Sequence, residues 1–302
     1  MEWKSRRIEA ILEQALVEDK ATSDITTSLT IEPGLRAAAT VLAKEECVLS
    51  GLGCIPRFLD IFARLDGRSS GRYEVVSHPE IFDGVRMRKG QAAAVIRHNA
   101  RVILACERVI LNLMQRMSGI ATLTRRYVDE IRDTSVKILD TRKTVPGLRI
   151  LDKYAVRCGG GENHRLDLSD GILIKNNHIA LGGGIEKVLA RAKERRKLGQ
   201  TIDIEVRNIA ELTLALDHGA ESLLLDNMTP AELGHCVELV RARSGRGVPP
   251  VLVEASGGIT LETVGDFAAA GADLISIGAL THSAPILDIG LDLSTGQVAG
   301  LG

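Results

Sequence analysis

Short runs of apolar residues alternate with helical patterns along the second half of the chain. Six of these runs are rich in Leu, Ile and Val and lie at residues 136–140, 171–177, 201–206, 222–227, 251–256 and 273–278. Most of them show little alternation of apolar and polar positions, which is typical of strands covered on both faces. They predict six strands of a parallel sheet.

Helical segments lie between most of these runs, at residues 186–199, 208–219, 230–245 and 261–271. Each ends in a glycine, which is common directly after the last turn of a helix. Asn208 with Glu211, and Thr229 before Pro230, are signals for a helix start. Alternating strands and helices predict a parallel α/β sheet curled into a barrel, and the barrel is incomplete because six strands are visible.

The first 115 or so residues have a different pattern. A helix is expected at about 4–17, and alternating segments with turns at Asp83-Gly84 and Lys89-Gly90 follow it. This pattern predicts an α+β open sandwich with a mostly antiparallel sheet. A long helix at about 100–131 is expected to carry the chain into the barrel.

We therefore divide the chain into two domains. Residues 1–115 form an N-terminal α/β sandwich domain, and residues 116–282 form the α/β barrel domain. A C-terminal tail of about 283–302 could pack back on the first domain. No low-complexity linker separates the two, so we expect them to pack closely.

Composition narrows the class of protein. The 302 residues are 45% hydrophobic and 25% charged, as in a globular protein, and the net charge of −1 argues against nucleic acid as a partner. No apolar run approaches the roughly 20 residues that span a bilayer, and a signal-peptide core is missing. The five cysteines show no C-x-x-C pair. We expect a cytoplasmic protein with reduced thiols and no membrane partner.

Polar residues suited to charged ligands follow all six predicted strands. They are Arg142 and Lys143, Lys175 with Asn176-Asn177-His178, Glu205, Asp226 with Asn227, Glu254 with Ser256-Gly257-Gly258, and Ser276-Ile277-Gly278. Because the carboxyl ends of parallel strands converge on one mouth of a barrel, we expect these side chains to lie together. One polar strand end could be a solvated loop, but six together are harder to explain in that way.

The set suits a ligand with several anionic groups and a divalent metal. Arginine forks match carboxylates or phosphates, and Ser-Gly turns let backbone N–H groups approach a phosphate. Glu205 and Asp226 could hold ribose hydroxyls or Mg²⁺, directly or through water. Segment 141–178 has seven Lys or Arg and four Asp or Glu, which suggests an acidic ligand, although a solvated basic face would look the same. A glycine turn within it presents His164 and Arg165.

Longer stretches resemble one family. The central ones are DTRKTVPGLR, KYAVRCGGGENHRLDLSDGILIKNNHI, EVRN, LLLDN, EASGGI and SIGALTHSAPILDIGLDL, and the earlier ones are ALVEDKATSDITT and ERVILNLMQRMSGIAT. In this order they closely resemble quinolinate phosphoribosyltransferase over essentially the whole chain. The resemblance implies an N-terminal sandwich, an incomplete barrel, and a homodimer or a dimer-based hexamer in which one subunit's N-terminal domain caps the other's barrel. It also implies a reaction in which quinolinate and phosphoribosyl pyrophosphate, with Mg²⁺, give nicotinate mononucleotide, pyrophosphate and CO₂.

The resemblance implies roles for individual residues. Arg142, His164, Arg165 and Lys175 would surround the two carboxylates of quinolinate, and Arg108 would reach the neighbouring subunit's site. Lys143, Glu205 and Asp226 would be catalytic and would bind phosphoribosyl pyrophosphate, the two acids also serving Mg²⁺. The remaining substrate-binding residues would be Thr141, Ser256, Gly257, Gly258, Ser276, Ile277 and Gly278.

Small departures from the family pattern and two alternatives stay open. Asn176 stands where an aspartate is common, and Asp203 stands where many relatives have glutamate. One alternative is a related type II phosphoribosyltransferase that acts on nicotinate or is associated with molybdenum transport. The other is a non-catalytic barrel that binds a phosphorylated metabolite. The number of cations favours a dicarboxylate substrate, and the intact Lys143, Glu205 and Asp226 weigh against a mere sensor.

Overall fold

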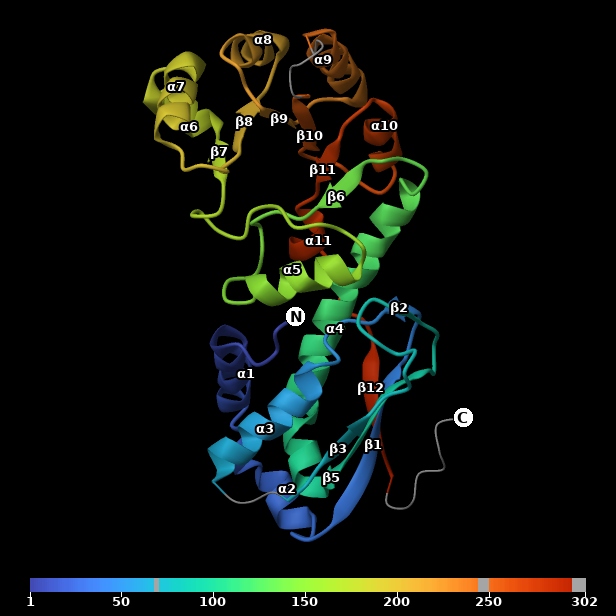
Figure 1. Ribbon diagram of the computed structural model, residues 1–302. Coiled ribbons are helices and arrows are strands. Elements are labelled where there is room, and N and C mark those ends of the chain that lie inside the picture. The colour runs from blue at the N-terminus through green and yellow to red at the C-terminus, as the bar shows by residue number, and fades with distance from the viewer. Residues whose placement is uncertain (68–70, 244–249, 295–302) are drawn as a thin grey trace. The chain divides into compact units, whose positions relative to one another are not determined.

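The computed structural model describes residues 1–67, 71–243 and 250–294 (Figure 1). They form two compact units that interleave along the sequence. The first unit contains Met1–Arg125, Val145–Gly160 and the chain from Ala284, and the second contains Arg126–Thr144 and Gly161–Ser283, each in its described parts. The domain boundaries expected near residues 115 and 282 stay a prediction.

The first unit is built on a four-stranded antiparallel sheet with the strand order β12-β1-β5-β3. Its strands are β1 (Arg36–Ala43), β3 (Glu74–Val76), β5 (Ala92–Asn99) and β12 (Ile289–Ser294). Two short strands, β2 (Cys47–Val48) and β4 (Arg86–Met87), form a separate antiparallel pair. Strand β12 comes from the C-terminal part of the chain and pairs with β1 along its length, as the red and blue arrows show. The antiparallel sheet expected from the sequence is confirmed.

The first unit also contains helices, several of which bury apolar residues in its core. They are α1 (Arg6–Glu18), α2 (Ile25–Thr30), α3 (Cys54–Asp66), α4 (Ala100–Glu130) and α5 (Arg149–Cys158), with a 3-10 turn η1 (Ala21–Ser23). In α1, Ile8, Leu12 and Leu16 recur every four residues and are buried, as an amphipathic helix requires. They share a core with Phe58 of α3 and Ile110 of α4. The expected long helix at about 100–131 is confirmed by α4.

A buried ion pair fixes α5 in the first unit. The carboxylate of Asp152 is fully buried and accepts two hydrogen bonds from Arg116 of α4, at 2.9 and 2.8 Å. It also accepts from the backbone N–H of Val145 at 3.3 Å. A buried carboxylate needs such partners, because an unpaired charge in the interior is costly. This pairing explains why residues 145–160 belong to the first unit.

The second unit contains six parallel strands in the order β6-β11-β10-β9-β8-β7. They are β6 (Lys137–Leu139), β7 (Ile172–Ile174), β8 (Ile202–Val206), β9 (Ser222–Asp226), β10 (Leu252–Ser256) and β11 (Leu274–Ser276). In the part of the chain that the structure describes, no pairing joins β6 to β7, so the barrel stays open there. Glu162 instead bridges to Leu139 on the free side of β6. The incomplete six-stranded α/β barrel predicted from the sequence is confirmed.

Helices α6 (Asn176–Gly182), α7 (Ile185–Arg195), α8 (Ile209–Asp217), α9 (Pro230–Arg243), α10 (Val264–Ala269) and α11 (Ala279–His282) connect these strands. The predicted start signals are confirmed, since the Asn208 side chain accepts from the N–H of Glu211, and Thr229 and Glu232 bond reciprocally. Helix ends were predicted less well, because α7 stops at Arg195 and α10 covers only 264–269. Gly245, the predicted end of the third helix, lies outside the described residues.

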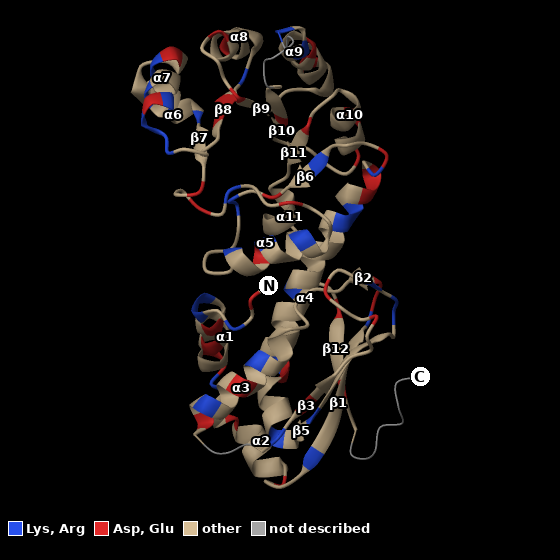
Figure 2. Cartoon of the chain, viewed as in Figure 1, with Lys and Arg blue, Asp and Glu red and all other residues tan. Residues whose placement is uncertain are grey.

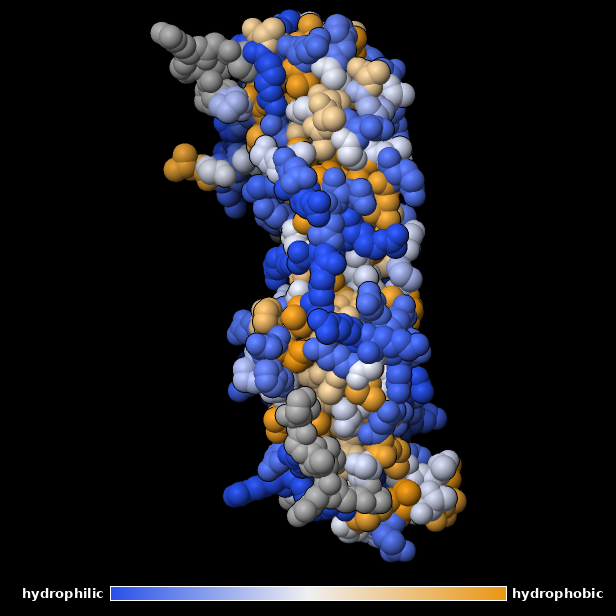
Figure 3. Space-filling model, turned by 90° about the vertical axis from the view of Figure 1, so that its right-hand side faces the viewer, coloured by the Kyte–Doolittle hydropathy of each residue, from blue (hydrophilic) through white to orange (hydrophobic). Residues whose placement is uncertain are grey.

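Charged residues of both signs are interspersed along the chain, and α7, for example, carries blue and red residues (Figure 2). On the face drawn in Figure 3, hydrophobic residues lie in small groups between hydrophilic ones. Helix α4 has 31 residues. Neither it nor any other described helix is long and apolar enough to cross a bilayer.

Substitution of a helical glycine in each unit tests how closely that helix packs within its own unit. A Cβ on Gly119 of α4 would lie 1.9 Å from the carbonyl oxygen of Pro285, whereas a Cβ on Gly265 of α10 would meet nothing within 4 Å. We expect Gly119→Ala to lower the free energy of unfolding by about 1–3 kcal/mol. Gly265→Ala should leave it unchanged or raise it by up to about 1 kcal/mol, because alanine favours helices. Thermal unfolding followed by circular dichroism measures both, and an unchanged Tm for Gly119→Ala would contradict the close packing on Pro285.

Candidate active site

The register of the parallel strands aligns three polar residues at the carboxyl ends. Asp226 of β9 pairs with Ser256 of β10, and Ser256 pairs with Ser276 of β11. Side chains alternate between the two faces of a strand, so Val253 and Ala255 of β10 are fully buried and do not line the cavity, which Ser256 does. We call Asp226, Ser256 and Ser276 the rim row.

A second row lies on the same face, two residues earlier along strands β9 and β10. Glu205 of β8 and Glu254 of β10 both pair with Leu224 of β9, and all three line the same cavity. We call these residues the inner row. Both carboxylates are buried, with 7% of Glu205 and 2% of Glu254 exposed, so their charges need partners.

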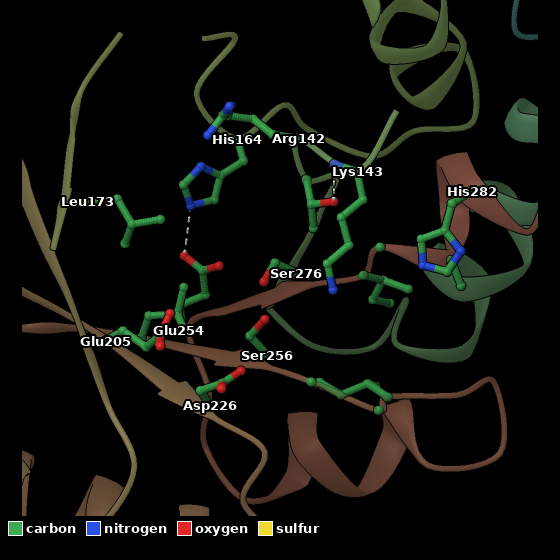
Figure 4. A pocket seen from close by; sticks show the side chains of 18 of the residues that line it. Arg142, Lys143, His164, Leu173, Glu205, Asp226, Glu254, Ser256, Ser276 and His282 are labelled. Atoms are coloured by element: carbon green, nitrogen blue, oxygen red, sulfur yellow. Dashed lines mark hydrogen bonds and ion pairs between the residues drawn. The ribbon is translucent and has the colours of Figure 1, made fainter. Parts of the chain in front are cut away.

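The cavity occupies about 480 Å³ at the carboxyl ends of the strands, a size typical of small-molecule sites (Figure 4). All but one of the predicted site residues line it, namely Thr141, Arg142, Lys143, His164, Arg165, Lys175, Glu205, Asp226, Ser256, Gly257, Gly258, Ser276, Ile277 and Gly278. Arg108 does not line this cavity, and it lies exposed on α4 in the first unit. The structure thus brings the residues together, and their individual roles stay predictions.

The cavity also has lining residues that the predicted set lacked. Glu254 stood among the polar residues at the predicted strand ends, but the family resemblance assigned it no role. His282 is the last residue of α11 and does not directly follow a strand, and Figure 4 shows it on the same side as Lys143. Leu173 and Leu224 add apolar surface between the charged groups.

His164 is held through its backbone and through both ring nitrogens. Its backbone N–H donates to the buried Asp140 at 2.9 Å, and its Nδ1 accepts from the backbone N–H of Arg165 at 2.8 Å. Its Nε2 lies 3.4 Å from Oε2 of Glu254, along the dashed line in Figure 4. Because Nδ1 acts as an acceptor, the proton of the neutral ring is placed on Nε2, which faces Glu254.

Two arginines face the cavity with unused donors. Burial, followed by the charge of Arg142, lowers the pKa of Arg165, while Asp203 and Asp170 act in the opposite direction. The Nε atoms of Arg142 and Arg165 are buried and have no hydrogen-bond partner among the described residues. Like charges held together with free donors favour an anion between them.

Carboxylates oppose the cations from across the cavity. Nζ of Lys175 lies 4.0 Å from Oε2 of Glu205, and Glu254 faces His164. Asp203 lies on the same strand as Glu205, and burial, followed by the charge of Glu254, raises its pKa. Positive groups from the β6–β7 side therefore meet negative groups from β8 and β10.

The turn after β10 packs closely against the residues that end β9. Asn227 adopts a left-handed conformation, its backbone N–H donates to the carbonyl of Ser256 at 2.8 Å, and its amide donates to Asp226 at 2.8 Å. Gly257 has φ +95°, and a Cβ there would lie 2.3 Å from Oδ1 of Asn227. At Gly258, with φ +64°, a Cβ would meet nothing within 4 Å. A side chain is therefore excluded at Gly257 by both conformation and space.

The two predicted metal ligands fit Mg²⁺. Glu205 and Asp226 offer carboxylate oxygens, the hard ligands that this ion prefers. Over the described residues, no group of three or more metal-binding side chains gathers in one place. Mg²⁺ commonly binds through one or two carboxylates and completes its shell with water and substrate phosphates, so a sparse set suits it.

The cysteines lack the features of reactive nucleophiles. All five are unpaired and buried. Burial raises the pKa of Cys47 to about 11 and that of Cys106 to about 12, and it also raises the pKa of Cys54, Cys158 and Cys236. The reactive thiolate form is therefore scarce at neutral pH.

An open α/β barrel with cations, carboxylates and glycine turns at its mouth defines a protein that binds small, highly charged ligands. The family model for the quinolinate phosphoribosyl transferase C-terminal domain matches residues 120–292, and the model for the N-terminal domain matches residues 24–118. The chain belongs to the quinolinate phosphoribosyltransferase family and is a phosphoribosyltransferase.

Individual relatives agree over nearly the full length. The chain is 41% identical over 283 residues to a nicotinate-nucleotide pyrophosphorylase (carboxylating) of Mycobacterium leprae, which covers 93% of this chain and 95% of the relative. It is 39% identical over 288 residues to a probable enzyme of the same name from Bacillus subtilis, covering 95% and 94%. The crystal structure of NadC from Streptococcus pyogenes superposes with a TM-score of 0.86 at 35% identity, covering 96% and 97%.

These comparisons decide between the alternatives left open by the sequence. A structure of human nicotinic acid phosphoribosyltransferase, at 14% identity and a TM-score of 0.59, shares the fold alone. The family models and the relatives near 40% identity select the quinolinate family instead. The enzyme names of these relatives also set aside the non-catalytic barrel.

The turn after β10 gives a paired test. We expect Gly257→Ala to lower kcat/KM for phosphoribosyl pyrophosphate by about 100-fold, because the new Cβ displaces Asn227 and with it Asp226. Gly258→Ala, which strains the backbone but meets open space, should lose about 10-fold or less. Initial-rate kinetics on both variants measure this, and equal losses would mean that the contact with Asn227 is unimportant.

Proposed function

We propose that the chain transfers the phosphoribosyl group of phosphoribosyl pyrophosphate to quinolinate, giving nicotinate mononucleotide, pyrophosphate and CO₂. One observation carries the choice of a dicarboxylate: Arg142 and Arg165 hold buried, unpartnered Nε donors beside one another. Two guanidinium forks can each take a carboxylate. Lys175 adds positive charge to the same cavity, and His164 adds a neutral polar ring.

Phosphoribosyl pyrophosphate would occupy the remaining part of the cavity. The turns at Ser256-Gly257-Gly258 and Ser276-Ile277-Gly278 offer backbone N–H groups to its phosphates. A Cβ on Gly278 would come within 3.0 Å of the Lys143 chain, so the missing side chain leaves room for that lysine. The carbonyl of Lys143 accepts from the Thr281 hydroxyl at 2.8 Å, which anchors its backbone.

The proposed transfer breaks the bond between C1 of the ribose and the pyrophosphate oxygen, and both electrons leave with pyrophosphate. The ring nitrogen of quinolinate supplies the electron pair of the new C–N bond. Glu205 and Asp226 stabilise the positive charge that develops on the ribose, and Lys143 balances charge on the leaving group. The 2-carboxylate then leaves as CO₂, its electrons pass into the pyridinium ring, and a proton adds at that carbon.

Mg²⁺, held by Glu205 and Asp226 directly or through water, would neutralise phosphate charge when bound. The protein's own contribution is orientation: two substrates fixed in one cavity react without the entropy loss of a bimolecular encounter. No covalent intermediate with the enzyme is required.

We also propose a homodimer, or a dimer-based hexamer, in the cytoplasm. Arg108 is exposed in the first unit and would complete the site of a neighbouring subunit. Large hydrophobic side chains stand exposed in both units, with Leu29 80% and Leu181 91% exposed, and contact with another subunit would cover such surface. Five buried and unpaired cysteines suit a reducing compartment.

The substrate assignment is tested with quinolinate and with nicotinate in parallel reactions. We expect product from quinolinate alone, and an Arg142→Ala variant should lose about 10- to 100-fold in kcat/KM, since hydrogen bonds to charged groups contribute about 1.5–3 kcal/mol. Lys197→Ala, which removes an exposed cation outside the cavity, is the matched control. Chromatography of nicotinate mononucleotide gives the rates, and turnover of nicotinate alone would overturn the assignment.

The metal assignment has its own test. Asp226→Asn should raise the Mg²⁺ concentration for half-maximal activity about 10-fold or more, because a neutral amide oxygen binds the ion more weakly. Asp217→Asn changes an exposed acid that pairs with Arg243 and should leave the Mg²⁺ dependence unchanged. Activity is titrated against Mg²⁺ at saturating substrates, and identical curves for wild type and Asp226→Asn would remove Asp226 from the metal site.

A further inference from the structure

Glu254 is a buried carboxylate with one oxygen paired and one unpaired. Only 2% of the residue is exposed, and it lines the cavity from β10. Its Oε2 lies 3.4 Å from Nε2 of His164, while Oε1 is buried without a hydrogen-bond partner among the described residues. Burying a charged group is costly, so the contact with His164 stabilises the carboxylate of Glu254 in its buried position.

The partner of Glu254 is itself part of a chain of contacts. His164 receives the backbone N–H of Arg165 at Nδ1, and its own backbone N–H donates to Asp140. The imidazole therefore links a rigid strand of the sheet to the loop that carries Arg165. Parallel pairing with β9 and β11 fixes the position of Glu254 in β10.

The geometry also argues against contact between Glu254 and the dicarboxylate. A carboxylate of the ligand would be repelled by Glu254, whose charge already raises the pKa of the neighbouring Asp203. Glu254 and Glu205 belong to the same inner row; Glu205 opposes Lys175, and Glu254 faces the ring of His164. Figure 4 shows Glu254 directed at the His164 ring and located below it, away from Arg142.

We propose that Glu254 is a positioning residue for the cations that bind the dicarboxylate. It fixes the ring of His164 and, through the hydrogen bond at Nδ1, the backbone of Arg165, so that Arg165 stands beside Arg142 before the ligand arrives. A cation pair held in place binds a dianion without the entropy loss of ordering long side chains. This inference rests on the proposed function, since it concerns the quinolinate half of the cavity.

Two substitutions distinguish the effect of the contact with His164 from the effect of the charge on Glu254. Glu254→Ala removes the contact with His164, whereas Glu254→Gln keeps a carbonyl oxygen that can accept from Nε2. We expect Glu254→Ala to raise KM for quinolinate about 10- to 100-fold, with KM for phosphoribosyl pyrophosphate within about 2-fold of wild type. Glu254→Gln should restore most of the loss. Glu238→Gln, at an exposed position on α9, is the control.

Each other outcome overturns the proposal. Wild-type kinetics in Glu254→Ala would show that the contact has no role. If Glu254→Gln raised KM for quinolinate as much as Glu254→Ala, the effect would come from the charge of Glu254. A raised KM for phosphoribosyl pyrophosphate would make Glu254 a ligand of that substrate. Thermal unfolding shows whether Glu254→Ala is folded. If it is not, Glu254→Asp, which keeps the charge but withdraws it from His164, takes its place and should raise KM for quinolinate in the same way; wild-type kinetics in Glu254→Asp would then contradict the proposal.

The proposed function can fail separately, because it is measured on the wild-type chain. If wild type forms no nicotinate mononucleotide from quinolinate, the proposed function is wrong. Positioning is then read from the ¹⁵N resonances of the His164 ring. We expect Nδ1 to resonate as an acceptor and Nε2 to carry the proton in wild type, with this pattern lost in Glu254→Ala. An unchanged pattern would falsify the positioning role.

Discussion

The fully buried carboxylate of Asp140 is the constraint on which the arrangement of the cavity depends. It follows β6, and it accepts hydrogen bonds from the backbone N–H of His164 at 2.9 Å and from the Asn163 side chain at 2.6 Å. Glu162 bridges to the same strand one step earlier. The loop that carries His164 and Arg165 is thereby attached to the free side of β6, where a closed barrel would have another strand. The open barrel thus gains its cation loop at the position of the missing strands.

Strand register then decides what faces that loop. In a parallel sheet, paired residues on neighbouring strands point to the same face of the sheet and form a row. A shift of the register by one residue would turn their side chains to the opposite face. The observed register places Asp226, Ser256 and Ser276 at the rim and Glu205 and Glu254 below them. Cations enter from loops on one side of the cavity, and carboxylates stand on strands opposite. The strands are rigid, so the acids form the fixed half of the site and the cations are held against them.

Much of this could be predicted from local sequence. Buried strands show as apolar runs, and polar residues directly after them had to converge on one end, which located Arg142, Lys143, Lys175, Glu205 and Asp226. Caps at Asn208 and Thr229 act within one helical turn, so they too were visible. Short helices such as α5 and α11 were missed because tertiary partners stabilise them, as Asp152 does through Arg116. The contact between His164 and Glu254 joins distant segments and leaves no local signal.

The opposition of charges also bears on turnover. If every cation stood free, the cavity would bind the quinolinate dianion and its product with needless strength, and strong uniform binding does not accelerate the chemical step. The pairing of Lys175 with Glu205, and the charge of Glu254 beside the neutral ring of His164, moderate the positive field in the absence of substrate. In the proposed reaction the pyridine ring becomes cationic on transfer and loses one carboxylate as CO₂. The cations that hold two carboxylates of the substrate then face one carboxylate in the product, so the same electrostatics that favour quinolinate entering the site weaken the hold on nicotinate mononucleotide once the reaction is complete.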